Sequence, residues 1–330
     1  MRAQTLLAVA AAFCAAAARA ENIKPAIVYD LGGKFDKSFN EGAFRGGQKF
    51  TADTGIAVRD FEIQNDAQRE QALRRFARDG NTPIMAVGFG HASALAKVAP
   101  DFPKTRFAIV DVAVDQPNVK SIVFREHEGA YVVGVLAAMA SKTGEVGFVG
   151  GMDIPLIRKY ACGYRQGVHS VDPAMQVIEN MTGVTGAAWA DPVKGGELAR
   201  AQIDRGADVV LQAAGGTGLG VLRAAADAGK LAIGTDANQN GLYPGHVLTS
   251  LLKRVDAAII RGFEAARDDT WRDGIESLGL KEGGLAWALD DNNAALVTPA
   301  MKDAADKAVA AIASGAVVVH DYTSDSQCPP

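Results

Sequence analysis

The stretch AIVYDLGGKFDKSFNEGAFRGGQKFTADT, residues 26–54, contains the first copy of a pattern that recurs along the chain. Its apolar run AIVYDL (26–31) predicts a buried strand, and two glycines then lead into an amphipathic helix at 38–54. An aromatic side chain, Phe39, and an amide, Asn40, stand where the strand gives way to the helix. A strand followed at once by a helix is the unit from which parallel sheets are built.

The same alternation of strand and helix continues to about residue 253. Further strands are expected at 56–63, 83–89, 106–112, 121–126, 145–151, 175–181, 207–216, 231–236, 246–252 and 285–289. Helices are expected at 66–80, 91–102, 128–141, 155–170, 192–205, 219–229, 254–270 and 299–314. A second series of alternating strands and helices begins near residue 126, and each of the two series has about five strands. The pattern therefore predicts two α/β lobes with parallel sheets rather than one large sheet.

We divide the chain into a leader and two lobes. Residues 1–20 form a signal peptide, residues 21–126 and about 254–280 form the N-terminal lobe, and residues 127–253 and about 281–330 form the C-terminal lobe. Two such lobes joined by crossovers enclose a cleft at the carboxyl ends of their strands. Ligands of α/β folds bind at those ends, so this is where functional residues are expected.

The first twenty residues predict export. Arg2 supplies a positive start, and the apolar run LLAVAAAFCAAAA (6–18) is too short to span a bilayer. The sequence ARA (18–20) then offers small residues at the positions that signal peptidase recognises. We predict cleavage after Ala20 and a location in the periplasm. The alternative is a lipoprotein signal that uses Cys14, although the residues before this cysteine lack the usual leucine and small residue.

The composition is that of a globular protein with no electrostatic reason to bind nucleic acid. Of the 330 residues, 48% are hydrophobic and 22% are charged. The predicted leader contains two arginines and no acids, so 34 basic residues fall to 32 against 38 acidic ones, a net charge of −6. A mildly acidic chain is not attracted to nucleic acid or to an anionic membrane surface.

Two cysteines, Cys162 and Cys328, remain after the leader is removed. Export to an oxidising compartment allows a disulfide bond between them. The sequence leaves a second interpretation open, in which Cys162 is a buried thiol and Cys328 is a thiol in a frayed tail.

Polar and aromatic side chains gather at the expected carboxyl ends of the strands. These candidates are Asp30, Asp36, Phe39, Asn40, Asp111, Trp189, Asp191, Asp236 and Lys253. His91 follows the sequence GFG at the start of a helix, where we expect it to face solvent, with a ligand contact as the alternative.

Six segments occur in the order found in one protein family. They are DKSFNEGAFRGG, FAIVD, GEVGFVGGMDIP, GADVVLQAAGGTGLGV, AIGTDANQ and LTSLLKRVD. With them the chain resembles, over about residues 24–320, the basic membrane protein family of ABC transporter substrate-binding proteins, whose best-known members are purine nucleoside receptors. The resemblance implies the fold of a type I periplasmic binding protein, with two Rossmann-like lobes joined by hinge crossovers. It also implies an ABC permease of the inner membrane as partner, and no cofactor.

The resemblance further implies how a purine would be bound. Phe39 would stack on one face of the base, and Trp189, where phenylalanine is more usual, would cover the other face. Stacking on an aromatic side chain contributes about 1–3 kcal/mol per base. Asn40 would pair with the edge of the base, because a forked amide matches the donors and acceptors of a purine.

Four other positions complete the ligand-binding set that the resemblance implies, and Asp36 is added from its position after the first strand. Asp111 would accept from a ring N–H or an exocyclic amine, and Asp236 would accept from ribose hydroxyls. Lys253 would neutralise Asp236 and donate to a hydroxyl, while the backbone near Gly218 would supply N–H donors. Asp36 is included as a residue that lines the cleft, with a purely structural role in the first turn as the alternative.

Each of these residues also has a structural interpretation. Phe39 can be a core residue of its helix, and Trp189 a packing residue in a loop. Asp111 and Asp236 can be caps or turn formers, which aspartate favours at such junctions. Lys253 can be a solvated charge.

The sequence contains neither a dinucleotide-binding pattern nor a zinc-ligand pattern. The segment GGTGLG (215–220) lacks the G-x-G-x-x-G spacing of a dinucleotide site, and the five histidines show no zinc-ligand spacing. The function favoured is therefore a non-enzymatic periplasmic receptor for a purine nucleoside or purine base. The alternative is an exported nucleoside hydrolase, with Asp30, Asp36 and Asp111 as the candidate carboxylates.

Overall fold

The computed structural model describes residues 23–329, so the predicted signal peptide, its cleavage site and Cys14 lie outside the described residues. The chain divides into two compact units. Unit 1 holds the described residues up to Asp30, together with Ala43–Val123 and Asp256–Glu276, and unit 2 holds Leu31–Gly42, Phe124–Val255 and the residues from Ser277 onward. Residues 31–42, which the sequence-based division assigns to the N-terminal lobe, thus group with unit 2.

The first sheet has six strands in the order β11-β5-β4-β3-β1-β2. Its strands are β1 (Ala26–Tyr29), β2 (Arg59–Glu62), β3 (Ile84–Ala86), β4 (Phe107–Val110), β5 (Val119–Phe124) and β11 (Gly274–Leu278). The pairings from β2 through β1, β3 and β4 to β5 are all parallel. The helices associated with this sheet are α2 (Phe39–Thr54), α3 (Ala67–Arg78), α4 (Ala92–Val98) and α9 (Val255–Arg267).

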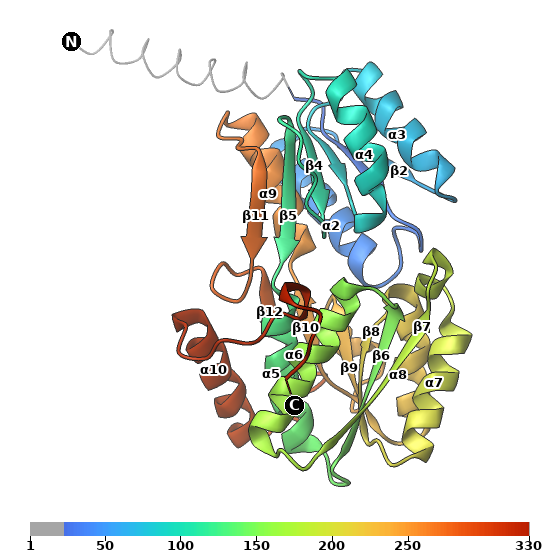
Figure 1. Ribbon diagram of the computed structural model, residues 1–330, viewed down its shortest axis with the longest axis vertical. Helices are drawn as coiled ribbons and strands as arrows, with labels where there is room; N and C mark the ends of the chain where they lie inside the picture. The colour runs from blue at the N-terminus through green and yellow to red at the C-terminus, as the bar shows by residue number, and fades with distance from the viewer. Residues whose placement is uncertain (1–22, 330) are drawn as a thin grey trace, which may run out of the picture. The chain divides into compact units, whose positions relative to one another are not determined.

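The second sheet also has six strands, in the order β12-β10-β9-β8-β6-β7. They are β6 (Glu145–Met152), β7 (Gln176–Gly183), β8 (Val209–Ala213), β9 (Leu231–Asp236), β10 (Val247–Lys253) and β12 (Leu285–Trp287). Only the pairing of β12 with β10 is antiparallel. The helices are α5 (Glu126–Ala140), α6 (Pro155–Val171), α7 (Pro192–Asp204), α8 (Gly218–Asp227) and α10 (Pro299–Ser314). In Figure 1, α7 and α8 pack together on one side of this sheet and α5 and α6 on the other.

The predicted two-lobed α/β fold is confirmed. Every residue of β1, β3, β4 and β8 is buried, as expected for parallel strands covered by helices on both faces. The sequence pattern did not reveal β11, because most of its GIESL segment is exposed and lacks an apolar run. The first sheet therefore has one strand more than the pattern predicted, whereas β12 of the second sheet corresponds to the strand expected at 285–289.

The strand order places the first strand of each series inside its sheet. In both, the second strand of the series lies on one side of the first, and the later strands lie on the other side. The order reverses beside β1 in the first sheet and beside β6 in the second. In open parallel sheets ligands bind at the carboxyl ends of the strands, next to this reversal.

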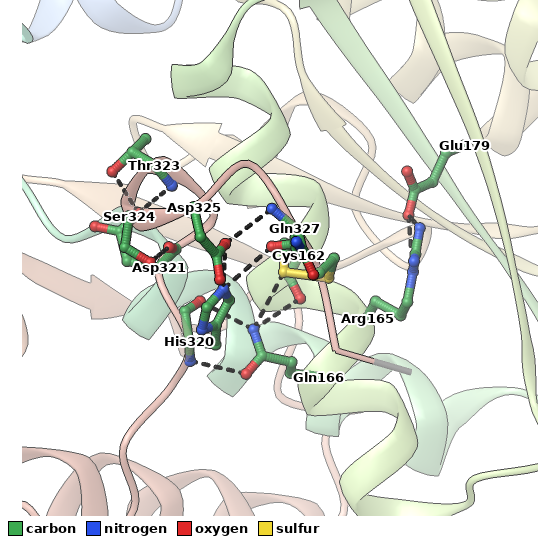
Figure 2. The surroundings of a disulfide bond; sticks show 11 residues. Cys162, Arg165, Gln166, Glu179, His320, Asp321, Thr323, Ser324, Asp325 and Gln327 are labelled. Carbon is green, nitrogen blue, oxygen red and sulfur yellow. Dashed lines mark hydrogen bonds and ion pairs between the residues drawn. A yellow bond between two sulfur atoms is a disulfide. The ribbon is translucent and has the colours of Figure 1, made fainter.

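A disulfide bond joins Cys162 of α6 to Cys328 in the C-terminal tail, across 166 positions of sequence. Of the two interpretations that the sequence left open, the disulfide is therefore present, and the two cysteines are not separate free thiols. The tail is also held by the side-chain amide of Gln166, which donates to the backbone oxygen of His320 at 3.0 Å and accepts from its backbone nitrogen at 2.8 Å. Figure 2 shows this second attachment beside the sulfur atoms.

Within residues 23–329, no helix combines the length and the apolar character needed to cross a membrane.

Candidate functional site

The segment between β1 and α2 is fixed to the turn that follows β9. Ser38 Oγ donates to Asp236 Oδ2 at 2.5 Å and lies 3.3 Å from the backbone oxygen of Thr235. Gln239 Nε2 donates to the backbone oxygen of Lys37 at 2.9 Å. These hydrogen bonds join residues about 200 positions apart in sequence. They place the SFN motif at the carboxyl edge of the second sheet.

Asp36 forms the cap of helix α2. Its carboxylate accepts from the backbone nitrogens of Ser38 at 2.8 Å, Asn40 at 3.0 Å and Glu41 at 3.1 Å. Burial raises the pKa of Asp36, although these three amide donors oppose the shift. The side chain thus serves the first turn of the helix, which orients the residues that follow it.

A buried network of amides and hydroxyls supports the same edge. Gln239 Oε1 accepts from Gln212 Nε2 at 2.8 Å and from the backbone nitrogen of Thr235 at 3.0 Å. The backbone nitrogen of Gln239 donates to Ser250 Oγ at 2.9 Å, and that hydroxyl donates to Asn240 Oδ1 at 2.8 Å. All five residues are buried. Such fully paired networks fix one geometry, since an unpaired buried group would be costly.

Two of the predicted acids occupy the left-handed backbone region, Asp111 with φ 77° and Asp236 with φ 68°. A non-glycine residue in this region carries strain of order 1–3 kcal/mol, and such residues cluster at ligand sites. Burial raises the pKa of Asp236, whereas Lys253 and the hydroxyl of Ser38 act in the opposite direction. Within unit 2, the charge of Lys253 therefore favours the ionised form of Asp236.

Lys253, at the end of β10, is only 4% exposed, so the interpretation as a solvated charge is wrong. Its ammonium group lies over three aromatic rings, 5.1 Å from the centroid of Phe39, 5.0 Å from that of Phe124 and 6.0 Å from that of Tyr160. Cations at such distances are attracted by the electron-rich face of the ring. One face of Phe39 is thus occupied by a buried positive charge.

Glu126 is a member of this cluster that the sequence analysis missed. It is fully buried, and its two carboxylate oxygens contact Lys253 Nζ at 2.9 Å and Lys159 Nζ at 2.5 Å. Burial alone would raise the pKa of Glu126, but the two ammonium groups outweigh it and lower the pKa to about 2. Its position gives only a partial signal, because Glu126 lies two residues after the carboxyl end of β5 and an acid at a helix start is common for other reasons.

Trp189 lies at the reversal point of the second sheet, in a short turn after β7. A Cβ atom at Gly151 would stand 2.2 Å from its Cζ3 atom, so the ring packs directly on the backbone at the end of β6. A Cβ at Gly215, after β8, would lie 3.8 Å from the same ring. Gly32 borders both the Asn40 amide and the backbone of Trp189, since its Cβ would be 3.8 Å and 3.9 Å from them. The side chain of Asn40 and the backbone of Trp189 therefore both border Gly32.

Gly218 begins α8 and is buried. A Cβ atom at this position would lie 2.0 Å from Gln212 Oε1, so the packing of Gln212 requires glycine here. Asp191, another residue at a strand end, caps α7 by accepting from the backbone nitrogen of Lys194 at 2.9 Å.

Unit 1 contains a second group of polar residues at the carboxyl ends of its strands. Asp111 follows β4, and Asp30, after β1, pairs with Arg69 at 2.6 Å. His91 is fully buried, so the expectation that it faces solvent is wrong. Burial lowers the pKa of His91 to about 4, although the nearby Asp30 opposes the shift. His91 ends the short 3₁₀ helix Phe89–His91, whose last side chain is buried. The position of a histidine at the start of a helix does not predict this burial.

No group of three or more His, Cys, Asp or Glu side chains within the described chain is arranged to hold a metal ion. Two of the carboxylates considered for a hydrolase have partners within their own units. Asp30 is engaged by Arg69, and Asp36 by three backbone amides.

Comparison with known proteins identifies one family and similar proteins within it. Residues 23–319 match the Bmp family, described as ABC transporter substrate-binding protein PnrA-like. The ABC transporter nucleoside-binding protein BmpA of Lactococcus lactis is 32% identical over 321 residues, which cover 90% of this chain and 89% of that protein. An uncharacterized lipoprotein of Pyrococcus furiosus is 32% identical over 82% of this chain and 71% of its own length.

The fold also matches solved structures. A solute-binding protein of an ABC transporter system from Aeropyrum pernix superposes with a TM-score of 0.81 at 29% identity, covering 90% of this chain and 94% of that one.

Proposed function

Because the chain belongs to the Bmp family of ABC transporter substrate-binding proteins, we propose that its ligand is a purine nucleoside or a purine base. The observation that carries the proposal is the placement of Phe39. Its half-buried ring has Lys253 over one face and stands at the carboxyl edge of the second sheet, next to the Ser38–Asp236 hydrogen bond. The relative in Lactococcus lactis is named a nucleoside-binding protein, which supports the same ligand class.

A flat heterocycle fits this arrangement on physical grounds. The ammonium group of Lys253 covers one face of the Phe39 ring, so a base would stack on the opposite face. In this proposal Trp189 supplies the second aromatic ring. Each stacked aromatic contributes about 1–3 kcal/mol with little dependence on the identity of the base. Specificity then comes from polar groups, since a donor or acceptor left unpaired in a buried site costs about 1–3 kcal/mol.

The polar roles follow from the chemistry of each side chain. Asn40 pairs with the edge of the base, and Asp236 accepts from ribose hydroxyls beside Lys253. Asp111 of unit 1 is the proposed acceptor for a ring N–H or an amine, and the backbone at Gly218 supplies donors. For Asp36 we propose an indirect role, because its carboxylate shapes the turn that presents Phe39 and Asn40.

The proposed place of action is the periplasm. Relatives include lipoproteins and ABC solute-binding proteins, which is consistent with a location outside the cytoplasm. In this proposal the leader is removed after Ala20, and the ligand-loaded protein delivers its solute to an ABC permease. The intact mass of the exported protein tests the cleavage, since a chain that begins at Glu21 is expected, and a chain acylated at Cys14 would overturn it.

Calorimetric titration of the mature protein with adenosine, guanosine, inosine and the free bases tests the ligand class. We expect saturable binding of at least one of these compounds and none of ribose alone. Absence of binding by every purine would overturn the proposal. A parallel incubation with inosine, followed by an assay for free hypoxanthine, separates a receptor from a hydrolase, because a receptor returns the nucleoside unchanged.

A further inference from the structure

Lys253 has a long flexible stem, and the structure shows what fixes the position of its charge. The ammonium group contacts Glu126 Oε1 at 2.9 Å and lies over the rings of Phe39, Phe124 and Tyr160. Ring faces attract a cation but define its position only loosely. A charge-assisted contact with a carboxylate is stronger and more directional. Glu126 is therefore a group that fixes the position of this ammonium.

Glu126 is itself held firmly. Its Oε2 atom contacts Lys159 Nζ at 2.5 Å, and the same ammonium group donates to the backbone oxygen of Phe124 at 2.8 Å. The side chain is fully buried at the first position of α5, where the positive end of the helix dipole favours a carboxylate. Two ammonium groups on one carboxylate leave no freedom for either oxygen to turn toward another partner.

A buried ion pair is weak evidence of stability, since apolar residues of the same volume would stabilise the fold as well. Its use is more often to fix one geometry. Here the geometry that it fixes includes the ring of Phe39, on which the proposed ligand stacks.

We propose that Glu126 is a positioning residue of the ligand site, which holds the ammonium of Lys253 against Phe39 and beside Asp236. This inference rests on the proposed function, because it assigns Lys253 to ligand binding. Glu126 does not touch the ligand and acts through Lys253. Without it, the ammonium group is free to move toward Asp236 alone, and one face of Phe39 loses its cation.

The matched control is Glu128, two positions further along α5. It is also a buried acid of the same helix, but its carboxylate contacts Arg125 and the backbone nitrogen of Leu280 at 2.8 Å. Glu126→Gln is expected to weaken purine nucleoside binding about tenfold or more, the loss typical when a group that orients a binding residue is removed. Glu128→Gln is expected to leave the dissociation constant within about twofold, even where it lowers the melting temperature.

A double-mutant cycle distinguishes positioning from a general structural effect. In a Lys253→Met background, Glu126→Gln is expected to change the dissociation constant less than about twofold, because Lys253 is the residue through which Glu126 acts. Equal losses in both backgrounds would overturn the inference, as would wild-type affinity in Glu126→Gln. If Lys253→Met binds too weakly to titrate, the comparison of Glu126→Gln with Glu128→Gln decides.

A measurement without ligand separates failure of this inference from failure of the proposed function. In ¹⁵N-lysine-labelled protein, the buried ammonium of Lys253 is expected to give a slowly exchanging signal that persists in Glu128→Gln and is lost or shifted in Glu126→Gln. An unchanged signal in Glu126→Gln contradicts the positioning role whatever the ligand is. A lost signal in Glu126→Gln, with no purine bound by the wild-type protein, contradicts the proposed function alone.

Discussion

Replacing Phe39 by alanine removes the ring on which the proposed base stacks, and the expected size of the effect can be worked from its contacts. One stacking face contributes about 1–3 kcal/mol, and each 1.4 kcal/mol is a factor of ten in affinity. The dissociation constant for a purine nucleoside should therefore rise about fivefold to about 140-fold. Lys253 remains in place in this variant, because Glu126 at 2.9 Å and the ring of Phe124 at 5.0 Å still hold it.

The variant should also remain folded. Phe39 is only half-buried, so its loss should cost no more than about 2 kcal/mol of unfolding free energy. Phe39→Leu separates stacking from packing, since leucine restores apolar volume without a flat face. We expect Phe39→Leu to recover the melting temperature but not the affinity. If Phe39 were only a core residue, leucine would preserve both properties.

Isothermal titration of each variant with adenosine, guanosine and inosine, after removal of any copurified ligand, provides the assay. Phe35→Ala is the control, because this aromatic of the same segment is 61% exposed and its loss should change the affinity less than about twofold. Wild-type affinity in Phe39→Ala would refute the reasoning. A loss in Phe35→Ala as large as that in Phe39→Ala would show that the segment, and not the ring of Phe39, governs binding.

Three further predictions concern other parts of the molecule. Gly151→Ala should displace the Trp189 ring, lower stability by about 1–3 kcal/mol and weaken nucleoside binding; unchanged tryptophan fluorescence and affinity would contradict this. Replacing Cys162 and Cys328 by serine should lower the unfolding free energy by about 2–5 kcal/mol, because the bond closes a long loop, and a urea midpoint insensitive to both substitution and reductant would argue against it. His91 has a pKa lowered to about 4, so protonation favours the unfolded chain. The unfolding free energy should therefore fall by up to about 3 kcal/mol between pH 6.5 and pH 4, and His91→Gln should flatten this slope; an equal slope in the variant would refute the assignment.

The sequence predicted most of the fold because parallel sheets give a strong local signal. Buried runs such as AIVY and FAIV read as strands without knowledge of their neighbours. The strand β11 gave no such signal, since its pairing is decided by tertiary contacts and most of its residues are exposed. The grouping of residues 31–42 with unit 2 is likewise non-local, because this segment is joined to the turn after β9 by hydrogen bonds such as those of Ser38 with Asp236 and of Gln239 with Lys37.

The candidate site was only partly predictable. Phe39, Asp236 and Lys253 could be selected because they follow strands and match motifs of a known family. Glu126 belongs to no such motif, and an acid at a helix start is usual on electrostatic grounds alone. Its importance depends on the burial of two lysines far away in sequence, which periodicity cannot reveal. His91 illustrates the same limit, since burial at a turn depends on what packs over it.

The most direct test of the central claim is native mass spectrometry of the exported protein, purified without denaturation. We predict a population whose excess mass equals that of a purine nucleoside or a purine base, and which loses this excess in Phe39→Ala. A retained solute of another chemical class, such as a sugar or an amino acid, would contradict the account.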